Sequence, residues 1–96
     1  MAFQTVIKTT LALGLLAAGP AAAETYKFMT GPQGGSWYPL GGAIANFVRG
    51  VDADVRLRVQ PGGGISNVMA VESGKAQVGL GNVTSTMDAI AGNAPF

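Results

Sequence analysis

After residue 23, stretches that look like β-strands alternate with stretches whose apolar residues have helical spacing. Apolar or aromatic stretches at 26–30, 54–60 and 76–81 have the length and composition of β-strands. Between them, apolar residues recur at helical spacing. We expect helices that open at 36–38, near Ile65 and near Thr84 or Ser85, and that stop at Gly50, Gly74 and Gly92.

The second stretch, 54–60, alternates strictly between apolar residues and arginines or other polar residues. Such a strand has one buried and one solvated face, which suits a sheet edge. With right-handed crossovers the simplest strand order is 2-1-3. The pattern therefore predicts an α/β fold, the start of a doubly wound and mainly parallel sheet with a switch point between strands one and three. Glycines inside elements, at Gly41, Gly42 and Gly79, indicate close approach of a neighbouring segment or a ligand.

Each strand runs into a polar, glycine-rich loop that opens a helix, at 30–36, 60–64 and 81–85. In a parallel sheet, three helix N-termini at one rim present free N–H groups, so this rim is a predicted anion-binding surface. Glycines let the main chain approach a ligand, and hydroxyl or amide side chains in the loops add donors. The spacing Ser85-Thr86-Met87-Asp88 also predicts a capping box. Trp37 and Tyr38 either wall a pocket or pack at a helix start.

Residues 1–23 have the three parts of a secretory signal. Lys8 supplies the positive charge, Leu11–Ala18 forms a short apolar run, and Ala21-Ala22-Ala23 offers a cleavage site. The apolar run is shorter than the ~20 residues that span a bilayer. We expect residues 1–23 to be cleaved and the mature chain to begin at Glu24 in the periplasm.

Composition narrows the function classes. Without Lys8, five basic residues face five acidic ones, and there is no basic run, which argues against nucleic acid as a partner. The chain has no His and no Cys, which leaves no His general base, thiol nucleophile or usual zinc ligands. Neither a Walker A sequence nor a Rossmann fingerprint is present, since Asn67 stands where the last Gly of 62–67 would have to be. We therefore expect no enzyme, no cofactor and no metal.

Size leads to a further expectation. Residues 24–96 are few for an independent α/β domain, because even ~60 residues bury only about 60% of their unfolded surface. A parallel sheet also requires helices on both faces. We expect 24–96 to be the incomplete N-terminal part of a larger domain.

Two sequence blocks carry a family resemblance. Thr30-Gly31-Pro32-Gln33-Gly34-Gly35-Ser36-Trp37-Tyr38-Pro39-Leu40-Gly41-Gly42 resembles the N-terminal signature of the TAXI solute receptors of TRAP transporters. The stretch from Gln60 to Asn67, followed by 71–80, is similar to the second block of that family. Pro32-Gln33, Trp37 and Gly81-Asn82 depart from the family pattern.

The resemblance implies the first lobe of a two-lobed periplasmic binding protein that is not an enzyme. Such a receptor captures a small carboxylate, an amino acid or organic acid such as glutamate, and delivers it to a TRAP-type membrane permease. Carried over by position, the ligand-binding residues are Gly35, Ser36, Tyr38, Gly63, Gly64, Ile65, Asn82, Thr84 and Ser85. A ligand-sensing domain of a signalling system, or an enzyme on a similar two-lobed scaffold, remains as an alternative.

Overall fold

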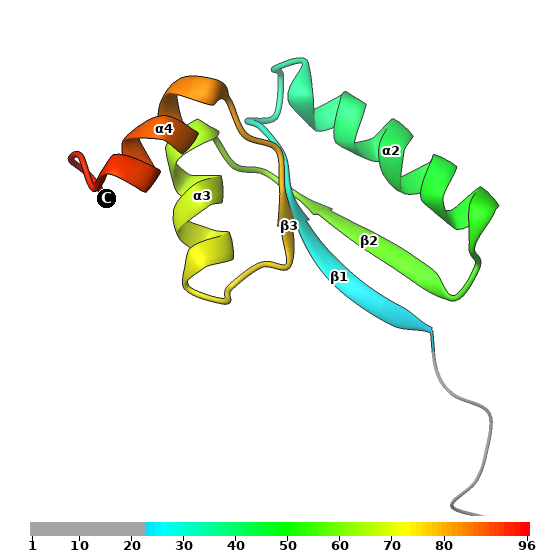
Figure 1. The fold of residues 1–96 in the computed structure, drawn as a ribbon. Helices are drawn as coiled ribbons and strands as arrows, with labels where there is room; N and C mark the ends of the chain where they lie inside the picture. Colours follow the sequence, from blue (N-terminus) through cyan, green and yellow to red (C-terminus); the bar gives the residue numbers. More distant parts are fainter. Residues whose placement is uncertain (1–22) are drawn as a thin grey trace, which may run out of the picture.

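Strands and helices alternate along the described chain. The computed structural model describes residues 23–96 (Figure 1). The elements are β1 (Glu24–Met29), α2 (Trp37–Val51), β2 (Val55–Gln60), α3 (Gly64–Glu72), β3 (Val78–Gly79) and α4 (Val83–Ala91). The predicted signal segment lies outside the described residues except for Ala23.

The three strands form one parallel sheet in the order β2-β1-β3, which confirms the predicted order 2-1-3. β1 pairs with β2 over its whole length, from Glu24 opposite Val55 to Met29 opposite Gln60. On its other side β1 pairs with β3, with Phe28 opposite Val78. Because β1 is central, the loop that follows it lies between the loops that follow the two outer strands.

The helices divide between the two sides of the sheet (Figure 1). α2 packs against β2, whereas α3 packs against β3 and α4. The apolar residues of β2 are half-buried, and Arg56 and Arg58 are exposed, as the alternating pattern predicted. The fold is therefore of the doubly wound α/β type.

Gly41 allows α2 to lie directly on the end of β1. A Cβ at this buried position would collide with the Thr30 side chain and lie 3.5 Å from Cγ1 of Val59. The close approach predicted at Gly41 is confirmed. At Gly42 no neighbouring segment of the protein comes close, because a Cβ there meets no atom within 4 Å.

Two of the three predicted helix ends are confirmed. Gly74 follows α3 at φ 76° and Gly92 ends α4 at φ 72°, and this left-handed backbone favours glycine. The stop predicted at Gly50 was wrong, since α2 continues to Val51. Asp52 ends it instead: its N–H donates to the Val48 carbonyl (2.8 Å), and its side chain accepts from the Asp54 N–H (2.9 Å), which closes the turn into β2.

β3 is shorter than the predicted 76–81, because only Val78 and Gly79 have strand structure and both are exposed. The Lys27 N–H, which a longer ladder would pair with backbone, donates to the Gln77 side chain (2.8 Å). The close neighbour predicted at Gly79 is confirmed. A Cβ there would lie 3.3 Å from Cβ of Asn67 and 3.4 Å from Cγ2 of Val71, both on α3.

Candidate functional site

The three loops that follow the strands meet at the carboxyl edge of the sheet (Figure 1). We call these loops, 30–36, 61–63 and 80–82, together with the first turns of the helices that follow them, the rim. A backbone hydrogen bond joins its first two loops, from Gly62 N–H to the Gly31 carbonyl (3.2 Å), and Thr30 N–H donates to the Gln60 carbonyl at the end of β2 (2.9 Å). Ligands of open α/β sheets bind at this edge.

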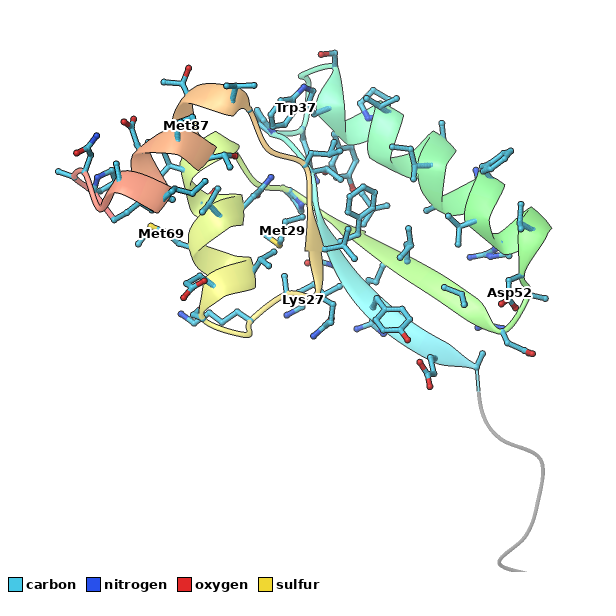
Figure 2. All side chains as sticks on the ribbon, in the orientation of Figure 1. Lys27, Met29, Trp37, Asp52, Met69 and Met87 are labelled. Atoms are coloured by element: carbon cyan, nitrogen blue, oxygen red, sulfur yellow. The ribbon has the colours of Figure 1, made fainter. Side chains whose placement is uncertain are left out.

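The first loop is closed by contacts of its own. Gly35 N–H donates to the Pro32 carbonyl (3.0 Å), and Gly34, at φ 92°, takes the turn position that requires glycine. A Cβ at Gly31 would lie 2.7 Å from Cβ of Trp37, so the Trp37 side chain packs directly against Gly31 of the loop (Figure 2). Of the two alternatives for Trp37, the contact with Gly31 favours packing at the helix start.

The predicted site residues of this loop are exposed or half-buried. Ser36 is exposed and its side chain makes no capping hydrogen bond to α2, while Gly35 and Tyr38 are half-buried. They stand at the start of α2, whereas α3 and α4 pack against each other. The structure therefore does not bring them into the groove formed by the other two loops.

The second and third loops enclose a shallow groove of about 530 Å³. It unites five of the predicted ligand-binding residues with two that were not predicted. Its lining residues are Gly63, Gly64, Ile65, Ser66, Met69, Asn82 and Ser85. Thr84, also predicted, is exposed on the first turn of α4 and is not among them. No residue that lines the groove carries a charge.

The start of α3 leaves backbone donors open toward this groove. Its N-cap is Gly63, which has no side chain to cap the helix. Among residues 23–96, the N–H groups of Gly64, Ile65 and Ser66 have no hydrogen-bond acceptor. Unpaired donors of this kind, with the helix dipole behind them, attract an anion.

α4 begins differently, because Asn82 caps it. The Asn82 side-chain oxygen accepts from the Ser85 N–H at 2.8 Å. The capping box predicted for Ser85 and Asp88 was therefore wrong: α4 starts at Val83, and Asp88 accepts from the Asn93 side chain (3.1 Å) instead. The other end of the Asn82 carboxamide occupies the space where a Cβ at Gly64 would stand. Glycine at 64 thus lets the two helix starts lie side by side.

Ser85 is the buried polar group of the groove. It is 8% exposed, and its Oγ lies 3.2 Å from the position of a Cβ at Gly64. Within the described part of the chain, no hydrogen bond involves its hydroxyl, and no fully buried side-chain oxygen or nitrogen is left unpaired. The hydroxyl is therefore open to the groove and free to donate to a ligand.

Asn67 is the residue that sequence reasoning missed. It is 1% exposed, and its side-chain nitrogen donates to the carbonyls of Thr30 (2.6 Å) and Leu80 (2.8 Å). Its side-chain oxygen accepts from the Gly63 N–H (3.1 Å). One carboxamide thus connects all three loops of the rim. In the sequence Asn67 stands out only as the residue that breaks the nucleotide-binding fingerprint, and no local signal announces its partners.

Neither a metal site nor a membrane span is found in the described part of the chain. Within residues 23–96 there is no group of three or more acidic, His or Cys side chains placed to hold a metal ion. No helix over the same residues has the length and hydrophobicity needed to cross a membrane.

A doubly wound sheet with an uncharged groove at its carboxyl edge is the architecture of a ligand-binding lobe. Residues 28–96, well over half of the chain, match the NMT1-like family, and the chain belongs to that family. The family is of the periplasmic binding-protein type, and such proteins bind small molecules and are not an enzyme class. No solved structure matches the chain.

Proposed function

We propose that this protein is an extracytoplasmic solute-binding receptor for a small carboxylate, such as glutamate or another amino or organic acid. The observation that carries the proposal is the groove between the starts of α3 and α4. There the free N–H groups of Gly64, Ile65 and Ser66 lie on a common surface with the open hydroxyl of Ser85.

The chemistry of the groove supports a carboxylate as the ligand. All of these groups are hydrogen-bond donors, and none is a charged side chain. Hydrogen bonds to a charged acceptor contribute about 1.5–3 kcal/mol each, so a few such donors hold one carboxylate without a cation. A phosphate, with more negative charge, is less well matched because the lining includes no Lys or Arg.

Export and delivery are part of the same proposal. The predicted cleavage site ends at Ala23, and β1 begins at Glu24, so removal of the signal would leave the sheet intact. The two sequence blocks that resemble TAXI receptors now support a more specific role within the NMT1-like family. In that role the loaded receptor passes its ligand to the membrane subunits of a TRAP-type permease.

Calorimetric titration of the full chain with L-glutamate, L-aspartate, succinate and acetate tests binding. The substitution Asn82→Asp tests whether the carboxylate binds in this groove, because Asp caps a helix as well as Asn does but places a negative charge in the groove. We expect saturable binding of at least one carboxylate, and an affinity about tenfold lower in the variant, equivalent to ~1.4 kcal/mol.

The matched control is Asn46→Asp, which makes the same change at an exposed site on α2 away from the rim. Its affinity should equal that of the wild type. Absence of binding to every carboxylate, or an equal loss in both variants, would contradict the proposal. Export is checked separately by N-terminal sequencing of the secreted protein, which should begin at Glu24.

A further inference from the structure

The Asn67 side chain holds the beginning of α3 from inside the protein. Its oxygen accepts from the N–H of the N-cap residue Gly63 at 3.1 Å. A capping box has two halves: the N-cap side chain bonds to the first turn, and a first-turn side chain bonds back to the N-cap N–H. Asn67, one position beyond the residue that does this in a capping box, bonds back to the N-cap N–H, and Gly63 has no side chain to bond to the first turn.

This arrangement fixes the helix start without using up its donors. The N-cap N–H is satisfied, while the next three N–H groups, of Gly64, Ile65 and Ser66, stay open among the described residues. Meanwhile the nitrogen of the same carboxamide binds the Thr30 carbonyl at the end of β1 and the Leu80 carbonyl after β3. The open donors are thus held in a fixed position relative to the third loop and to Ser85.

We infer that Asn67 is the positioning residue of the carboxylate groove: it contacts no ligand, and it fixes the open donors of α3 beside the Ser85 hydroxyl. This inference rests on the proposed function. Its support is a side chain that is 1% exposed, with hydrogen-bond partners on all three loops of the rim.

The neighbours of Asn67 leave it little freedom to move. A Cβ at Gly62 would collide with its oxygen, and a Cβ at Gly79 would lie 3.3 Å from its Cβ. The hydrogen-bond partners of the carboxamide are all backbone groups: the carbonyls of Met29, Thr30 and Leu80 and the N–H of Gly63. The titratable residue of the adjoining cavity is Glu72, which is exposed at the end of α3.

Asn67→Asp tests the role through its pH dependence. The substitution keeps the acceptor for Gly63 but removes both donated hydrogen bonds, and an ionised carboxylate would face the carbonyls of Thr30 and Leu80. Burial and these carbonyls raise the pKa of a carboxyl group, and the protonated form regains one donor.

We expect the affinity of the full chain for L-glutamate, or for the panel carboxylate that the wild type binds, to fall about tenfold at about pH 8 and to recover at about pH 5. The wild type and Asn46→Asp serve as controls and should not show this recovery. Wild-type affinity of a folded Asn67→Asp variant at the higher pH would overturn the inference.

A second variant leaves Asn67 unchanged. Gly62→Ala directs a methyl group at the Asn67 oxygen, whereas Gly42→Ala adds the same methyl group where no atom lies within 4 Å. We expect Gly62→Ala to bind the carboxylate about tenfold more weakly than the wild type, and Gly42→Ala to bind it with wild-type affinity. Equal affinities of the two folded variants would overturn the inference.

Amide exchange measured by NMR on the wild type separates this inference from the proposed function. The side-chain NH₂ of Asn67 and the N–H of Gly63 should exchange at least about tenfold more slowly than the exposed side-chain NH₂ of Asn46. Slow exchange together with no carboxylate binding would refute the receptor proposal and retain Asn67 as the residue that orders the rim. Fast exchange of the Asn67 NH₂ in the folded protein would refute the positioning role whatever the ligand results.

Discussion

The first loop of the rim has the same kind of sequence as the second and third loops, but a different structure. It is closed by the protein's own groups, whereas the other two border a groove. In the first loop, Gly34 forms a turn, Trp37 packs on Gly31, and α2 rests on Thr30 at Gly41. In the other two, the first N–H groups of α3 and the Ser85 hydroxyl have no hydrogen-bond partner among residues 23–96.

The difference shows that a glycine-rich loop before a helix has at least two physical uses. At Gly31 and Gly41 the missing Cβ makes room for the protein's own side chains. At Gly63 it leaves the start of α3 without a capping side chain. The neighbours of each glycine decide between the two, and the variants below test the assignment of each loop.

The largest effect is expected where the first region is closed most tightly. Gly41→Ala would drive a methyl group into the buried, β-branched Thr30, and we expect the free energy of unfolding to fall by about 2 kcal/mol from overpacking. Gly42→Ala should instead raise it by about 0.5–1 kcal/mol, because that position is open and Ala favours a helix. Urea denaturation of both variants measures the difference. If both variants were stabilised, α2 would not rest on Thr30.

The next effect concerns the ligand and compares two serines. Ser85→Ala removes the buried hydroxyl of the groove and should weaken L-glutamate binding about tenfold, as expected for a hydrogen bond to a charged group. Ser36→Ala, in the first loop, should change affinity much less, because Ser36 is exposed and outside the groove. Calorimetric titration decides. A larger loss from Ser36→Ala would place the carboxylate at the first loop instead.

A smaller effect separates the two regions by helix capping. Asn82→Ala removes the hydrogen bond to the Ser85 N–H and should lower the free energy of unfolding by about 1 kcal/mol. Ser36 precedes α2 but makes no capping bond, so Ser36→Ala should leave stability within about 0.5 kcal/mol of the wild type. Thermal unfolding of the two variants measures this contrast. Equal losses would mean that both side chains cap their helices in solution.

The smallest effect lies at the opposite end of the sheet. The Tyr26 hydroxyl donates to the Glu24 carboxylate, and this hydrogen bond, followed by the charge of Glu24, raises the pKa of Tyr26 above 10.0. Because the folded-state pKa is the higher one, the stabilisation is present below the unfolded-state pKa and is lost as pH rises through the folded-state pKa. Tyr26→Phe should therefore lose less stability than the wild type in alkaline solution. Phenolate absorbance titration of both proteins checks the shift, and an unshifted wild-type curve would contradict the hydrogen bond.

Much of the fold follows from local pattern. The alternation of Val55, Leu57 and Val59 with arginines predicted an edge strand, and right-handed crossovers then left 2-1-3 as the simplest order. Gly74 and Gly92 predicted the ends of α3 and α4. Both adopt a positive φ, which few other residues favour. The end of α2 was misplaced because the turn chemistry of Asp52, and not Gly50, stops the helix.

The site was less accessible from the sequence. The pattern placed three polar loops at one edge of the sheet, and the resemblance to TAXI receptors pointed to Gly63, Gly64, Ile65, Asn82 and Ser85, which line one groove. It did not separate them from Gly35, Ser36 and Tyr38, since all three loops have the same composition of glycines and hydroxyl residues. Asn67 escaped notice because its partners Thr30 and Leu80 are distant in sequence and offer only backbone carbonyls.

By itself the sequence determined the alternation of strands and helices, the edge position of β2, the glycines that end helices and the absence of His and Cys. These properties depend on local geometry and composition, which a short window of residues contains. The tertiary structure alone decided which glycine makes room for a side chain, which helix start is capped by a side chain, and which carboxamide joins the loops. Those outcomes depend on atoms brought within hydrogen-bond or van der Waals distance from separate strands, and no local pattern encodes that distance.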